Sequence, residues 1–227
     1  MAHEFNNILT TILGYAEMLA EMLPPESAAL DYAEQIVESG RRAERIVEQV
    51  LIISRRGRHM SRPFDVLEAA SEMLPALYTS VSQTTRLDIE IADEPMAMFG
   101  TPRDLQHVLV NLCRNASEAQ DGGGAVLLKI APFDPEDAIP MSHGTLKAGA
   151  YLRMSVGDAG PGIRPEHAPR IFEPFFTTGG EKRRVGLGLS VVEATVRALK
   201  GQIDVGPGPD GGTCFTVFFP RLPEVAG

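Results

Sequence analysis

The chain has 227 residues, of which 44% are hydrophobic and 22% are charged, and it carries a formal net charge of −9 at pH 7. These values are ordinary for a globular protein with one large domain, or with a small element and a domain. The acidic balance argues against nucleic acid as a main partner and against binding to an anionic membrane surface. No apolar stretch is long enough to span a membrane, and no export leader is evident, so we expect a cytoplasmic location.

The first part of the chain predicts a helical hairpin. Apolar residues recur every three or four positions over residues 3–23, and Pro24-Pro25 ends this helix. A second helical pattern covers residues 27–56. Two such helices cannot bury their apolar stripes alone, whereas two hairpins form a four-helix bundle, so we expect a homodimer. Packing of the hairpin against the chain's own second domain is the alternative. The helical repeat of apolar residues is already present at residue 3. We therefore expect the natural protein to continue upstream, where any membrane anchor would lie.

The rest of the chain predicts one α/β domain, which makes the whole chain α+β. Residues 1–57 form the hairpin, residues 58–64 form a basic linker that follows Gly57 and contains Pro63, and residues 65–227 form the second domain. Periodicity and end signals predict helices over residues 66–77, 102–119, 164–171 and 188–200, and strands over residues 86–92, 96–99, 125–131, 151–156, 202–205 and 214–219. This order suggests helices on one face of a mixed sheet. Cys113 and Cys214 are expected to be buried thiols.

His3 is the first candidate for chemistry. On a helix it falls almost opposite the apolar stripe, with Glu4 next to it and Asn7 one turn further on. A carboxylate beside an imidazole can hold the ring or accept its proton. Taken alone, this pattern favours the other interpretation, a solvated surface histidine without a functional role.

Four stretches of the second domain fit a nucleotide site. Asn111 and Asn115 stand four apart on one helix, where their amide oxygens could help to hold Mg²⁺ beside phosphates. Asp158 ends a strand and could accept a hydrogen bond from a base amine, and Gly160 and Gly162 would allow close backbone approach. A pair of solvated amides and an ordinary tight turn are the alternative interpretations.

The third and fourth stretches suit a polyphosphate. Phe172 begins an aromatic anchor that leads through Thr177-Thr178 into a glycine-rich loop with three consecutive cations, Lys182, Arg183 and Arg184. A basic solvated loop is the alternative. Gly186-Leu187-Gly188 then opens a helix whose bare backbone N–H groups would attract phosphate. The pattern matches neither a P-loop nor a dinucleotide fingerprint.

These motifs resemble a known family. His-Glu-Phe-Asn-Asn at 3–7, Asn-Leu-Cys-Arg-Asn-Ala at 111–116, Asp-Ala-Gly-Pro-Gly at 158–162, Phe-Glu-Pro-Phe-Phe-Thr-Thr at 172–178 and Gly-Leu-Gly-Leu-Ser at 186–190 are similar, in order, to the H, N, G1, F and G2 boxes of two-component sensor histidine kinases. The first box resembles the hybrid-kinase branch. The resemblance covers essentially the whole chain and implies a dimerisation and histidine-phosphotransfer hairpin followed by a Bergerat-type (GHKL) α/β sandwich.

The resemblance also implies roles for individual residues. His3 would accept the γ-phosphoryl group of ATP, Glu4 would orient or deprotonate its ring, and Asn7 would position water for dephosphorylating a partner. Asn115, supported by Asn111, would engage Mg²⁺ and phosphate, and Asp158 would bind the adenine amine. The remaining positions would shape the ATP pocket and its lid, namely Gly160, Gly162, Phe172, Thr177, Thr178, Lys182, Arg183, Arg184, Gly186, Leu187 and Gly188.

The lid departs from the family's pattern. Family members commonly have Gly-Thr before Gly-Leu-Gly-Leu, where this chain has Arg184-Val185, and Gly179 replaces the usual lid lysine. We hypothesise that Lys182, Arg183 and Arg184 supply the missing charge. The expected function is ATP-dependent autophosphorylation of His3 and transfer to an aspartate of a response-regulator receiver domain, with dephosphorylation of that regulator as an additional activity. A non-catalytic phosphotransfer or pseudokinase scaffold, and a GHKL-type ATPase without phosphohistidine, are the alternatives.

Overall fold

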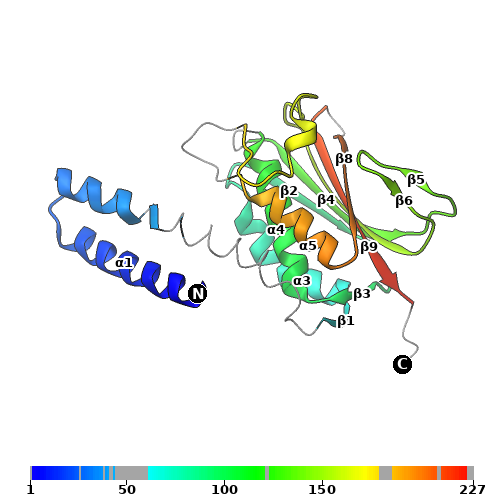
Figure 1. The fold of residues 1–227 in the computed structure, drawn as a ribbon, viewed down its shortest axis with the longest axis horizontal. Coiled ribbons are helices and arrows are strands. Elements are labelled where there is room, and N and C mark those ends of the chain that lie inside the picture. Colours follow the sequence, from blue (N-terminus) through cyan, green and yellow to red (C-terminus); the bar gives the residue numbers. More distant parts are fainter. Residues whose placement is uncertain are drawn as a thin grey trace. The chain divides into compact units, whose positions relative to one another are not determined.

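The computed structural model describes residues 2–25, 27–37, 39–40, 43, 61–120, 123–178, 186–208 and 211–223, with side chains from residue 8 onward. The chain divides into two compact units, Met1–Arg56 and Gly57–Gly227 (Figure 1).

The first unit is a helical hairpin, as predicted. Helix α1 covers Ala2–Met22, and the chain is helical again at residues 28–37 and 39–40. The Ser27 hydroxyl accepts a hydrogen bond from the Leu30 N–H at 3.2 Å, which is a side-chain cap for the returning helix. Leu13 is buried, and a Cβ added at Gly40 would lie 2.7 Å from its Cδ2 atom, so the two helices approach closely at this glycine.

The second unit is an α/β sandwich. Its described elements are β1 (Arg62–Asp65), α3 (Val66–Ser80), β2 (Arg86–Ile91), β3 (Ala97–Gly100), α4 (Pro102–Glu118), β4 (Ala125–Phe133), β5 (Ile139–Pro140), β6 (Thr145–Leu146), β7 (Tyr151–Asp158), the 3-10 turn η1 (Ala168–Arg170), α5 (Gly188–Ala198), β8 (Gln202–Pro207) and β9 (Thr213–Leu222). The seven-stranded sheet has the order β1-β3-β9-β7-β4-β2, with β8 also paired to β9. The β2–β4 pair is parallel and the others are antiparallel, which confirms a mixed sheet.

One apolar core joins the three helices of this unit to a single face of the sheet (Figure 1). Leu105, Leu109 and Leu112 of α4 repeat at helical spacing and are fully buried. Over residues 151–156 of β7, alternate residues are buried, which gives the two-residue period of a strand with one face in the core, and the last three residues of β7 are all buried. The core therefore fixes the faces that α4, α5 and the end of β7 present to one another.

The structure corrects three predictions. Strand β1 covers residues 62–64, which we assigned to the linker; it is short and antiparallel to β3, an edge position where Pro63 is tolerated. Residues 164–171 form turns and the three-residue η1 instead of a helix, because Pro165 and Pro169 cannot donate helical hydrogen bonds. Residues 132–150, to which we assigned no strand or helix, contain the β5–β6 hairpin, and Leu146 in it is fully buried.

Candidate functional site

The two asparagines of α4 meet the first turn of α5. Helix α4 begins as predicted: Thr101 is its cap, and its hydroxyl accepts from the Asp104 N–H at 3.2 Å. The amide oxygens of Asn111 and Asn115 lie 3.5 Å and 3.6 Å from the position that a Cβ would take on Gly188. The prediction that both amides share a face is confirmed, and that face adjoins the helix end expected to bind phosphate.

A buried carboxylate marks the end of β7. Asp158 is 4% exposed, and its Oδ1 atom accepts hydrogen bonds from the Gly160 N–H at 2.9 Å and the Thr213 N–H at 3.2 Å. Burial raises the pKa of this carboxyl above its ordinary value, and the two backbone hydrogen bonds oppose that rise. The hydrogen bonds that the described residues give Asp158 all fall on Oδ1, so Oδ2 is available to accept from a ligand.

Sequence reasoning missed the residues that enclose Asp158 from the connection between the last two strands and from the first residue of β9. A Cβ at Gly208 would lie 2.6 Å from the Asp158 carbonyl oxygen, and a Cβ at Gly212 would overlap the same oxygen. Thr213, which donates to the carboxylate, follows Gly212 directly. The glycine-rich run before β9 was a usable signal, but its partner lies 55 residues away in the sequence.

The aromatic segment forms a packed base for the loop that follows it. The Phe172 and Phe215 rings meet edge to face with centroids 6.5 Å apart. Gly186 has φ +70°, and a Cβ there would lie 2.5 Å from the Phe175 carbonyl carbon. The backbone at Phe175 therefore lies against Gly186, and only glycine fits at position 186. Leu187 is buried, whereas Thr177 and Thr178 are exposed.

Comparison with known families now decides the class of protein. Residues 100–223 match the family of histidine kinase-, DNA gyrase B- and HSP90-like ATPases, and residues 1–58 match the His Kinase A phospho-acceptor domain. The chain belongs to the histidine kinases of this ATPase family. A phosphoacceptor domain joined to an ATP-binding domain is the catalytic core of a two-component kinase, as the five motifs implied.

Curated relatives of this kinase core are sensor kinases. The chain is 30% identical over 224 residues to the sensor kinase CckA of Brucella abortus, covering 99% of this chain and 24% of that protein. It is 29% identical over 233 residues to the sensor protein TorS of Escherichia coli, covering 98% of this chain and 23% of that protein. The chain thus spans about a quarter of the length of these relatives.

Solved structures agree with the fold of the kinase core. A full-length ShkA structure in complex with AMPPNP matches with a TM-score of 0.70 and 27% identity, over 99% of this chain and 45% of that chain. The histidine kinase AdeS of Acinetobacter baumannii matches in fold with a TM-score of 0.60 and 22% identity, over 98% and 100% of the two chains.

Some predicted site residues of the kinase core lie outside the described part. The backbone of His3, Glu4 and Asn7 belongs to α1, but their side chains are outside the described residues, as are Lys182, Arg183 and Arg184 entirely. Gly160 and Gly162 are described; Gly162 has φ +74°, which favours glycine.

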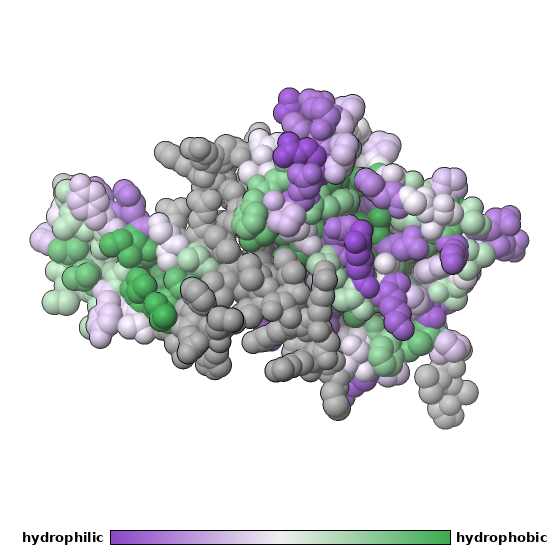
Figure 2. Space-filling model, viewed as in Figure 1, coloured by the Kyte–Doolittle hydropathy of each residue, from purple (hydrophilic) through white to green (hydrophobic). Residues whose placement is uncertain are grey.

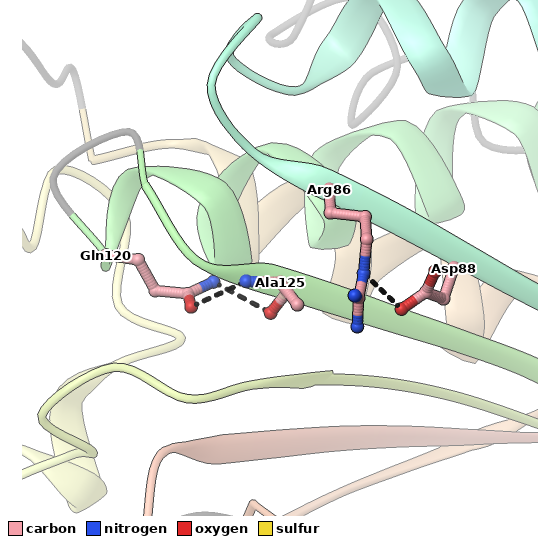
Figure 3. Close-up of polar contacts among 4 residues, drawn as sticks. All are labelled: Arg86, Asp88, Gln120 and Ala125. Atoms are coloured by element: carbon pink, nitrogen blue, oxygen red, sulfur yellow. Dashed lines mark hydrogen bonds and ion pairs between the residues drawn. The ribbon is translucent and has the colours of Figure 1, made fainter.

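A side-chain amide fixes the end of α4 that carries Asn115. The Gln120 Nε2 atom donates to the Ala125 carbonyl at 3.0 Å, and its Oε1 atom accepts from the Ala125 N–H at 3.2 Å (Figure 3). The same Nε2 also donates to the Ala116 carbonyl at 3.1 Å. Gln120 therefore ties the last turn of α4 to the first residue of β4, which reduces the freedom of the helix end beside the site.

The described residues contain no disulfide partner and no cluster of metal-binding side chains. Cys113 and Cys214 are free, and burial raises the pKa of the Cys113 thiol to about 12; Cys214 is half-buried, whereas we expected both to be buried. No group of three or more His, Cys, Asp or Glu side chains in the described ranges is placed to hold a metal ion. No helix in those ranges is long and apolar enough to cross a membrane.

Replacing Gly188 with alanine should weaken ATP binding without destabilising the fold. The added methyl would be in ordinary contact with Asn111 and Asn115, at 3.5 Å and 3.6 Å, and alanine is a better helix former than glycine. We expect the free chain to be at least as stable, but ATP affinity to fall about tenfold, because the methyl occupies space where phosphate approaches the backbone N–H groups. Calorimetric titration with ATP and thermal unfolding measure both effects.

The matched control is Gly14→Ala in α1, a helical glycine with nothing within 4 Å of an added Cβ. This change should preserve ATP affinity. Wild-type ATP affinity in Gly188→Ala would contradict the assignment of the first turn of α5 to phosphate.

Proposed function

We propose that the chain is an ATP-dependent protein-histidine kinase core that phosphorylates His3 and passes the phosphoryl group to an aspartate of a response-regulator receiver domain. The convergence of Asn111, Asn115 and the first turn of α5 carries this proposal, because it gathers amide groups and a helix N-terminus as a polyphosphate site requires. The buried carboxylate of Asp158 supports it as an acceptor for the adenine amine.

The donor set near Gly188 fits Mg²⁺ bound together with a polyphosphate. Mg²⁺ prefers oxygen ligands and keeps several waters, so a neutral amide oxygen can complete its shell beside phosphate oxygens. We assign this role to Asn115, whose Oδ1 atom lies against the first turn of α5. When bound, Mg²⁺ would neutralise charge on the β- and γ-phosphates.

The proposed transfer needs positioning more than covalent machinery. A ring nitrogen of His3 forms the N–P bond, the bond between the γ-phosphorus and the β–γ bridging oxygen breaks, and ADP leaves. Glu4 takes the imidazole proton or orients the ring, and Asn7 positions water when a phosphorylated regulator is hydrolysed. Such chemistry would take place in the cytoplasm, where ATP is available.

A labelling experiment tests the proposal. The chain is incubated with Mg²⁺ and either γ-labelled or α-labelled ATP, and the label that stays with the denatured protein is measured. We expect stable labelling from γ-labelled ATP alone, and transfer of that label to added receiver domains. Sustained ATP turnover without a phosphoprotein would favour the GHKL-type ATPase, and failure to bind ATP would favour the scaffold.

An exposed apolar stripe on α1 supports a homodimer. Its members recur at alternating spacings of four and three residues, and their exposed fractions lie between 46% and 79%: Ile8, Ile12, Tyr15, Leu19 and Met22. Other residues of α1, Leu13 and Ala16, are already buried. Figure 2 shows apolar surface over this unit. A four-three repeat is the pattern of helices that pack in bundles, so we assign the stripe to a second copy of the hairpin.

Leu19→Glu should dissociate the dimer. Two-fold symmetry would bring two glutamates into the apolar interface, so we expect the dissociation constant to rise by roughly a hundredfold or more. Light scattering over a dilution series measures this change. Thr10→Glu, an exposed position on the other side of α1, is the control and should stay dimeric. An unchanged dimer in Leu19→Glu would contradict the assignment of the stripe.

A further inference from the structure

Arg114 lies between the two site asparagines in the sequence, and its side chain turns back to the first of them. Its Nη2 atom donates to Asn111 Oδ1 at 2.6 Å, and Asn111 Nδ2 donates to the His107 carbonyl at 2.8 Å. A guanidinium only donates and a backbone carbonyl only accepts, so these two bonds fix the orientation of the Asn111 amide. Because Asn111 is 7% exposed, the pair is anchored in the packed domain.

The Arg114–Asn111 pair adjoins the first turn of α5. The same Oδ1 atom that accepts from Arg114 lies 3.5 Å from the Cβ position of Gly188. Helix α5 has no side-chain cap at Leu187 and no acidic residue in its first turn. A helix N-terminus carries partial positive charge, so the guanidinium and the helix end are two positive groups that lie near the same amide oxygen.

No carboxylate in the described part of the chain balances this charge. The ion pairs given for those residues include ones of Arg86, Lys129, Arg164, Arg170, Arg197 and Arg221, and none of them involves Arg114. A guanidinium has five N–H donors, and the described contact with Asn111 occupies one of its nitrogens. Arg114 therefore retains both charge and donors for an anion, and its planar fork matches phosphate geometry.

We propose that Arg114 binds the polyphosphate of ATP and that Asn111 positions it. This inference rests on the proposed function and deepens it by assigning a cation to the phosphate end of the site. It also assigns different roles to the amides of Asn111 and Asn115. The Asn111 oxygen already accepts from a cation, which would repel a nearby Mg²⁺, so Asn115 is the amide that serves the metal.

Arg114→Gln tests the charge while keeping a planar amide that can donate to Asn111. We expect ATP affinity to fall roughly tenfold to a hundredfold, the range for losing a hydrogen bond to a charged group. Affinity for adenosine, which lacks phosphate, should stay at the wild-type value. Arg114→Lys keeps the charge without the fork and should retain more ATP affinity than Arg114→Gln. Calorimetric titration of the full chain with each ligand gives these values.

Arg86→Gln is the matched control, because Arg86 is an exposed arginine of β2 that pairs with Asp88 at 2.9 Å (Figure 3). Its ATP and adenosine affinities should equal those of the wild type. Wild-type ATP affinity in Arg114→Gln would overturn the proposal, as would equal weakening of ATP and adenosine. A wild-type chain that binds no ATP would instead overturn the proposed function.

The positioning role of Asn111 has its own readout. Asn111→Ala should weaken ATP binding less than Arg114→Gln, and the double variant should be no weaker than Arg114→Gln alone, because both changes act on one interaction. If the losses of ATP affinity from the two single changes were additive in the double variant, Asn111 would not act by positioning Arg114.

Discussion

Asp158→Asn should strongly weaken nucleotide binding without unfolding the protein. Asp158 Oδ1 accepts from the Gly160 and Thr213 N–H groups, and the asparagine oxygen can keep both bonds. The asparagine Nδ2 would then replace the oxygen that faces the ligand, so two donors would meet where a carboxylate accepted from the adenine amine. We expect ATP affinity to fall by roughly a hundredfold, since a charge-assisted hydrogen bond is lost and a donor is left unpaired.

Relative to the wild type, the same variant should become more stable as the pH rises. Burial raises the folded-state pKa of Asp158 above 3.8, so the folded chain holds its proton more tightly than the unfolded chain. The stabilisation from that proton is complete below 3.8 and is lost as the pH rises through the raised value. Asparagine does not titrate and therefore has no such loss. The unfolding midpoint of Asp158→Asn, measured relative to that of the wild type, should rise as the pH increases from 3.8 to the raised pKa. It should stay raised at neutral pH.

Thermal unfolding with and without ATP measures both effects of this variant. ATP should raise the midpoint of the wild type much more than that of Asp158→Asn. Asp88→Asn, at an exposed carboxylate of β2, is the control and should keep the full ATP shift. An ATP shift of wild-type size in Asp158→Asn would contradict the role of this carboxylate.

Local signals were sufficient for the elements that position the site. Thr101 and Pro102 predicted the start of α4, and the structure begins the helix at Pro102 with the Thr101 cap. Four-residue spacing predicted that Asn111 and Asn115 share a face, and both face Gly188. These predictions succeeded because caps and helical periodicity depend only on residues within a few positions of one another.

Contacts between distant strands could not be read from the sequence. Thr213 donates to Asp158 only because β7 and β9 pair in a register that brings their ends together. Nothing local to Gly212 or Thr213 specifies that register. The Arg114–Asn111 hydrogen bond is different, because its three-residue spacing was visible, yet a guanidinium at that spacing has many other partners available.

His3→Gln should remove the phosphoprotein altogether. Glutamine has no imidazole nitrogen to form the N–P bond, so label from γ-labelled ATP should fall to background while ATP affinity stays at the wild-type value. Unchanged ATP affinity would separate the loss of the acceptor from damage to the ATP-binding domain. His143→Gln, at an exposed histidine of the second unit, is the control for nonspecific labelling of histidine.

The most direct measurement is therefore the acid and base stability of the label in these three chains after incubation with γ-labelled ATP and Mg²⁺. Phosphohistidine formation at His3 predicts acid-labile, base-stable label in the wild type and in His143→Gln, and none in His3→Gln. Label that survives in His3→Gln would contradict the assignment of His3 as the phosphoacceptor.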